Sequence, residues 1–81
     1  MFDEGIFDKE IDSLIEEGQQ KKAEKRMLKE YSALKESGRV RALAHVAFRL
    51  AYFYSVPDSE NLEQAEAYFL EGEVLEPGGR F

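Results

Sequence analysis

The run LAHVAFRLAYFYSVPDSENLEQAEAYFLEGEVLEP, residues 43–77, decides the fold of this chain. Its first half belongs to a segment, residues 40–56, that is apolar almost all round, and a helix of this kind must be covered on more than one side. Pro57 ends that segment because a proline disfavours the α conformation of the residue before it. Asp58 or Ser59 can then cap a further helix. We therefore predict a central apolar helix over 39–56 and a C-terminal helix over 59–76, folded back on each other as a hairpin.

The segment before this hairpin has helical periodicity with a polar interruption. Apolar residues recur at helical spacing in residues 6–15 and again in 27–34, so residues 7–37 are predicted to be helical. Between them, EEGQQKKAEKR (16–26) has Ala23 as its one apolar residue. Two geometries fit: one long helix kinked at Gly18, or two helices meeting near 18–20. We favour the long helix, because its residues are good helix formers and no proline intervenes.

Together these elements predict a single all-α domain over residues 1–81. It would be an antiparallel bundle of three helices, or of four if the N-terminal segment breaks, followed by a flexible tail at 77–81. A chain of 81 residues buries only about 60% of the surface that its unfolded form exposes. Cysteine is absent, so disulfides cannot compensate for the small core. We therefore expect a homo-oligomer, or a complex with another protein.

Charge is distributed in three blocks along the chain. The formal net charge is −6 overall, and it is made of −6 over residues 1–20, +6 over 21–49 and −6 over 50–81. An antiparallel bundle can lay the basic block beside the acidic ones, which offsets repulsion within each. The alternative interpretation is a basic surface for an acidic partner. The acidic total argues against a nucleic-acid partner.

The C-terminal hairpin resembles a tetratricopeptide repeat (TPR), the helix-turn-helix unit of about 34 residues that stacks into scaffolds. The resemblance covers residues 44–77 and rests on seven positions: Leu50, Ala51 and Tyr54, then Ala65, Phe69, Gly72 and Pro77. In that family Ala51 would more often be glycine, and the turn here is about two residues longer. The resemblance implies a TPR-like C-terminal hairpin and a protein-interaction module whose first helix lines the binding face. An unrelated bundle of three or four helices is the alternative.

One polar stripe on the central helix is the candidate partner-binding site. Arg41, His45, Arg49 and Tyr52 follow one another at intervals of four, four and three residues, which places them on one face. Arginine offers a planar fork of donors, so the functional interpretation is a docking line for an acidic peptide or a terminal carboxylate. The structural interpretation, which we favour, is that this side faces the acids of residues 1–20 or of the last helix.

The residues offer little for catalysis. His45 is the one histidine, and cysteine and threonine are absent, so a metal site or a paired nucleophile is difficult to assemble. We therefore predict no enzyme activity and no cofactor. The acidic N-terminus and the lack of a long apolar run predict a cytoplasmic protein that does not span a membrane. The predicted function is a small helical adaptor or oligomerisation module. The alternatives are a nucleic-acid-associated factor that uses the basic segment 21–49, and a binder of small apolar ligands.

Overall fold

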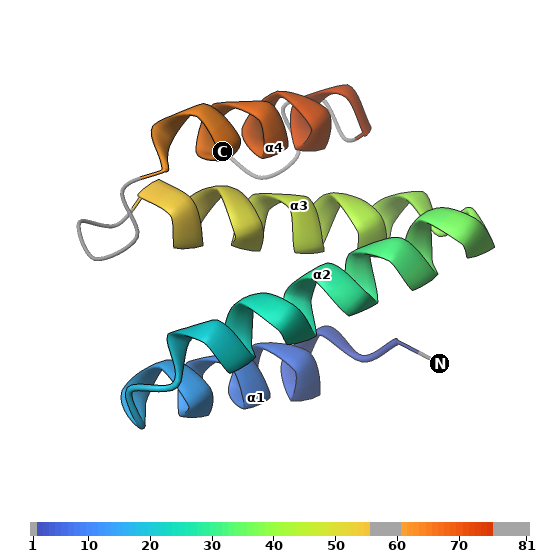
Figure 1. Cartoon of the computed structure of the whole chain (residues 1–81). Coiled ribbons are helices and arrows are strands. Elements are labelled where there is room, and N and C mark those ends of the chain that lie inside the picture. The colour runs from blue at the N-terminus through green and yellow to red at the C-terminus, as the bar shows by residue number, and fades with distance from the viewer. Residues whose placement is uncertain (1, 56–60, 76–81) are drawn as a thin grey trace.

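The computed structural model describes residues 2–55 and 61–75, and within these ranges the chain forms four α-helices and no strands. They are α1 (Glu4–Glu16), α2 (Gln20–Ser37), α3 (Val40–Ser55) and α4 (Leu62–Leu75). Figure 1 shows them following one another in space as they do in the sequence, with α3 between α2 and α4. The prediction of an all-α helical bundle is confirmed, with four helices.

The prediction of one long helix over 7–37 is wrong, because the chain breaks between Glu16 and Gln20. Gly18 has φ 76°, a left-handed conformation that glycine adopts without the strain of a Cβ atom. Its N–H donates to the carbonyl of Ile15. The break turns α1 back along α2, and Arg26 of α2 then pairs with Glu10 of α1 at 3.1 Å.

The other helix ends lie close to where the sequence places them. Gly38 closes α2 with φ 71°, and its N–H donates to the carbonyl of Leu34. The central helix, predicted over 39–56, spans Val40–Ser55 among the described residues. The last helix begins at Leu62, not at residue 59, because the Asn61 side chain caps it by accepting the N–H of Gln64 at 3.3 Å. The predicted caps at 58 and 59, and the predicted tail at 77–81, lie outside the described residues.

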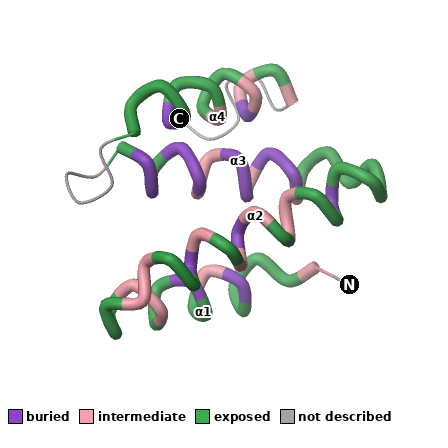
Figure 2. The backbone as a smooth tube through the Cα atoms, in the orientation of Figure 1, coloured by how far each residue is buried: buried purple, intermediate pink, exposed green. Residues whose placement is uncertain are grey.

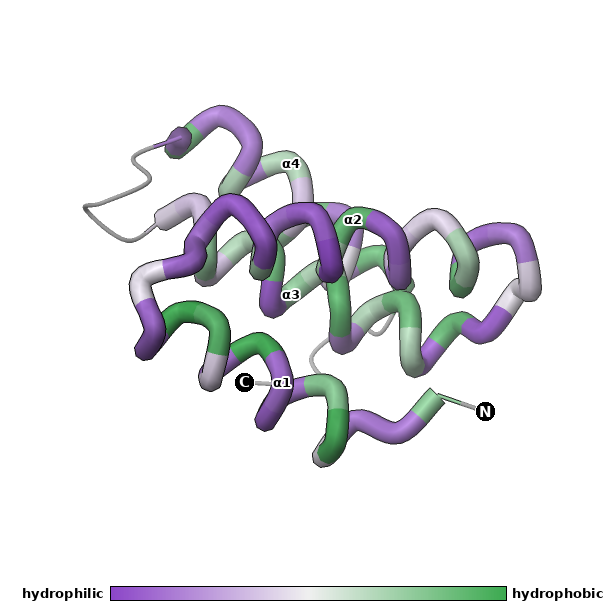
Figure 3. The backbone as a smooth tube through the Cα atoms, turned by 60° about the horizontal axis from the view of Figure 1, so that its bottom comes forward, coloured by the Kyte–Doolittle hydropathy of each residue, from purple (hydrophilic) through white to green (hydrophobic). Residues whose placement is uncertain are grey.

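The core is built around α3, as its all-round apolar composition predicts. Half of its sixteen residues are buried, and Figure 2 shows this burial along its length: Leu43, Ala44, Val46, Ala47, Leu50, Ala51, Phe53 and Tyr54. The other helices add to the buried cluster Phe7 and Ile11 of α1, Ala23, Met27 and Leu34 of α2, and Ala65 of α4. The first half of α2 is hydrophilic, as Figure 3 shows, yet Ala23 within it is fully buried.

Small residues bring α3 and α4 together. Ala51 and Ala65 are both buried, and Gly72 lies directly against the ring of Phe48. A Cβ atom on Gly72 would come within 2.8 Å of Phe48 Cε1, closer than two carbon atoms can approach without displacement. A larger residue at this position would therefore require the ring of Phe48 to move, so packing favours glycine here.

Candidate functional site

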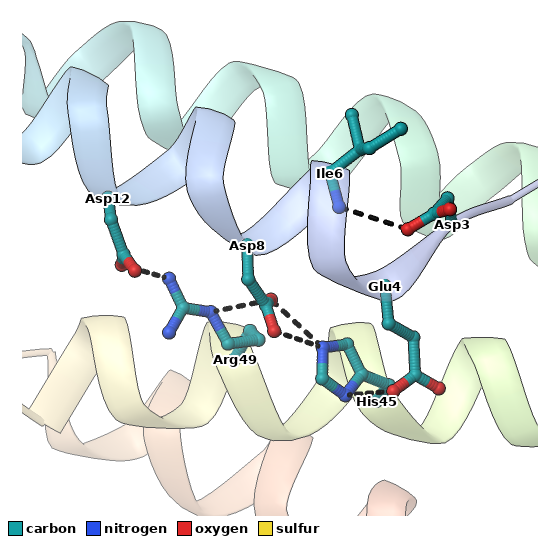
Figure 4. Close-up of polar contacts among 7 residues, drawn as sticks. All are labelled: Asp3, Glu4, Ile6, Asp8, Asp12, His45 and Arg49. Carbon is teal, nitrogen blue, oxygen red and sulfur yellow. Dashed lines mark hydrogen bonds and ion pairs between the residues drawn. The ribbon is translucent and has the colours of Figure 1, made fainter.

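The predicted polar stripe of α3 meets the acids of α1 in a charged cluster, drawn in Figure 4. His45 Nε2 lies 2.9 Å from Asp8 Oδ1, and His45 Nδ1 lies 3.4 Å from Glu4 Oε1. Both ring nitrogens therefore face carboxylate oxygens, and a protonated imidazolium can donate to both. The side chain of His45 is only 12% exposed, so this contact is an internal one.

Arg49 extends the same cluster by one helical turn. Its Nη2 donates to Asp12 Oδ1 at 2.8 Å, and its Nε lies 3.5 Å from Asp8 Oδ1. Asp8 thus stands between the histidine and the arginine of α3 and serves both (Figure 4). For His45 and Arg49 the geometry matches the structural interpretation, in which the acids of residues 1–20 cover the stripe. The predicted pairing of the basic block, residues 21–49, with the acidic block, residues 1–20, is found in this cluster and between Arg26 and Glu10.

The two residues at the ends of the stripe are exposed, unlike His45 and Arg49. Arg41 is exposed at the first turn of α3, and Tyr52 is 67% exposed near its last turn. The structure therefore brings His45 and Arg49 together with α1, and leaves Arg41 and Tyr52 at the surface. Of these two exposed residues, Tyr52 lines the apolar surface described next and Arg41 does not.

An apolar groove of about 700 Å³ runs between α3 and α4. Its walls come from these two helices: Phe48, Ala51 and Tyr52 of α3, and Leu62, Ala65 and Phe69 of α4. His45 and Arg49 form the border towards α1, and Glu66 lies on the side of α4. We call this surface the α3–α4 groove.

The groove exists because its floor is made of small residues and its rims of large ones. Ala51 and Ala65 are 7% and 8% exposed, whereas Tyr52 and Leu62 on the rims are 67% and 68% exposed. The rings of Phe48 and Phe69 meet edge to face, with centroids 5.9 Å apart. Leu62 and Phe69 lie on the same line of α4 as Ala65 and Gly72, and the sequence analysis did not predict that they are exposed. Their spacing of seven residues was the available signal.

A second polar cluster lies where α2, α3 and α4 meet, and it is structural. Tyr54 donates its hydroxyl to Glu24 Oε2 at 2.5 Å, and its ring stacks on Tyr68 at 5.9 Å between centroids. Tyr31 meets Tyr68 edge to face at 5.4 Å. Burial raises the pKa of Tyr54 above its ordinary value, and the hydrogen bond to Glu24 raises it further. These phenols remain protonated at neutral pH and join the helices.

Clusters of metal ligands and membrane-spanning helices are both absent from the described residues. Within 2–55 and 61–75, no three histidine, aspartate or glutamate side chains are gathered so as to hold a metal ion. Over the same ranges no helix has both the length and the apolar composition of a membrane span. The lysines of the basic segment lie exposed on α2, with Lys21, Lys22, Lys25 and Lys29 among them.

The chain matches no protein-family model, and no similar protein was found among curated proteins or solved structures.

Proposed function

We propose that this protein is a small helical interaction module that binds an apolar segment of another protein in the α3–α4 groove. The observation that carries the proposal is the exposure of large apolar side chains along both rims. Tyr52 and Leu62 are each about two-thirds exposed, and Phe69 beside them is 38% exposed. Aromatic residues are enriched in protein interfaces, where they bury a large area at a low cost in conformational entropy.

The helix pairing is consistent with the TPR-like interpretation, which we retain as part of the proposal. In that family the first helix of a hairpin lines the binding face, and Phe48 and Tyr52 of α3 do line the groove. The close contact of Gly72 with Phe48 supports the same packing. A single hairpin of this kind leaves one side of its second helix uncovered, because neighbouring repeats normally bury it.

The proposal changes the role of the predicted docking stripe. His45 and Arg49 are held by carboxylates of α1, so they position the border of the groove. Tyr52 is the residue of the stripe that we assign to partner contact. Arg41 does not line the groove.

Site-specific photo-crosslinking tests the proposal. A benzophenone amino acid placed at Tyr52 should yield a discrete crosslinked adduct with a partner protein in extracts of the source cells. The same group placed at Lys29, exposed on α2, is the matched control and should yield none. Adducts at both positions in equal amount, or at neither, would contradict the proposal.

A small apolar ligand is the second candidate occupant. The groove volume of about 700 Å³ lies within the range of small-molecule sites, roughly 300–1,000 Å³. Native mass spectrometry of the purified protein separates the two candidates. A bound small molecule that is released by Ala51→Leu would favour the ligand interpretation over the protein partner.

A further inference from the structure

We infer that the partner in the α3–α4 groove is a basic amphipathic helix. This inference rests on the proposed function and adds the shape and the charge of the segment bound. It follows from three observations. They are the spacing of the apolar contacts, the charge around them, and the lack of a basic surface with exposed apolar residues on this chain that could fill the groove of a second copy.

The spacing of the apolar contacts suits a helix. Leu62 and Phe69 on α4 are seven residues apart, which is about 10.5 Å along the helix axis. Phe48 and Tyr52 on α3 are one turn apart, on the facing wall. A partner helix presents apolar side chains at i, i+3 or i+4, and i+7, so two of its turns can occupy this length.

Carboxylates outnumber cations on α4 and in the α1–α3 cluster beside the groove. Between Leu62 and Leu75, α4 carries four glutamates and no basic residue, and Glu66 borders the groove. On the other side, three carboxylates of α1 surround the two basic residues of α3: Glu4, Asp8 and Asp12 around His45 and Arg49. Glu66 and this cluster together have four carboxylates against two cations, a net charge of −2 when His45 is protonated. Lysine and arginine on the polar face of a bound helix would complement it.

A second copy of this chain does not offer such a surface. Its basic residues are concentrated on α2, where the large apolar side chains are buried or half-buried: Met27, Leu28, Tyr31 and Leu34. Its exposed apolar side chains on α4 are accompanied by glutamates. A symmetric contact through the groove would bring the acids of two copies together, which is unfavourable.

The test uses two synthetic peptides of 18 residues with the same leucine face, one with lysine and arginine on its polar face and one with glutamate. Titration into the ¹⁵N-labelled protein should shift the amide resonances of Ala51 and Ala65 with the basic peptide. At low ionic strength its Kd should be about tenfold lower than that of the acidic peptide, because several partly exposed ion pairs act together. Glu66→Gln should weaken the basic peptide about two- to fivefold, and Glu36→Gln, an exposed acid of α2, should not.

The outcomes separate this inference from the proposed function. Equal or tighter binding of the acidic peptide in the groove would contradict the inference of a basic partner, but it would leave the proposed function as an interaction module standing. Binding of neither peptide would overturn the inference, and the crosslink at Tyr52 then decides the proposed function independently. A dimer in sedimentation that is abolished by Leu62→Ser would show that a second copy is the occupant, and would also overturn it.

Discussion

Replacing Gly72 by alanine tests how closely α3 and α4 approach at the end of the groove. The added Cβ atom would lie 2.8 Å from Cε1, 2.9 Å from Cζ and 3.0 Å from Cδ1 of Phe48. Overpacking of this kind costs about 1–3 kcal/mol. Alanine also gains about 1 kcal/mol over glycine in a helix interior. We therefore expect Gly72→Ala to destabilise the fold by about 0–2 kcal/mol, the difference between these two effects.

The clash can be isolated by a double-mutant cycle with Phe48→Leu, which removes the ring. In that background Gly72→Ala should stabilise the protein by up to about 1 kcal/mol, because only the gain in helix propensity remains. Urea unfolding followed by circular dichroism at 222 nm measures each free energy. Gly5→Ala is the control: its Cβ atom would have only an ordinary contact, 3.4 Å from Asp3 Oδ1, so it should stabilise by about 0.4–1 kcal/mol. If Gly72→Ala stabilises as much as Gly5→Ala in both backgrounds, the close approach of the helices is refuted.

Three other regions give predictions for the same unfolding assay. Gly38→Ala should cost about 1–2 kcal/mol, because alanine is strained at φ 71°; no change would mean that α2 ends differently. Tyr54→Phe should cost about 1.5–3 kcal/mol by removing the hydrogen bond to Glu24. Folding raises the pKa of Tyr54 above its unfolded value of 10.0, so the contribution of this phenol to stability should be fully present below about pH 10 and be lost as pH rises further. In a Tyr52→Phe background, which removes the exposed tyrosine, phenolate absorbance at 295 nm should rise together with unfolding, and a phenolate signal that precedes unfolding would contradict this. Asp8→Asn should cost about 1 kcal/mol by weakening two ion pairs, whereas Glu16→Gln, exposed on the same helix, should cost almost nothing.

The sequence predicted the centre of the fold well, because its signals there are local. An almost wholly apolar helix requires cover wherever it lies, and Gly38 marks a helix end by its own conformational freedom. The break at Gly18 was one of two geometries that the sequence allowed but not the favoured one, because a solvent-exposed helical segment and a turn have the same polar composition. The burial of Ala23 distinguishes them, and that depends on α1 folding back.

The candidate site was predicted only in part, for a related reason. Helical spacing places His45, Arg49 and Tyr52 on one side of α3, but which of them is covered depends on the path of α1. Leu62 and Phe69 share the packing line of α4 with Ala65 and Gly72, and the small residues take the close contacts. A helix face that carries both small and large apolar residues can therefore leave the large ones exposed, and the periodicity of the sequence alone does not predict this.

A matched pair of leucine substitutions on α4 tests the central claim, that the partner helix occupies the α3–α4 groove. Leu62 and Leu70 are 68% and 54% exposed, but only Leu62 lines the groove. Covering Leu62 by a partner removes apolar surface worth about 1–2 kcal/mol, so Leu62→Ser should weaken binding of the basic peptide about five- to thirtyfold. Leu70→Ser should change it by less than about twofold. Equal losses in the two variants, or a loss confined to Leu70→Ser, would contradict the claim.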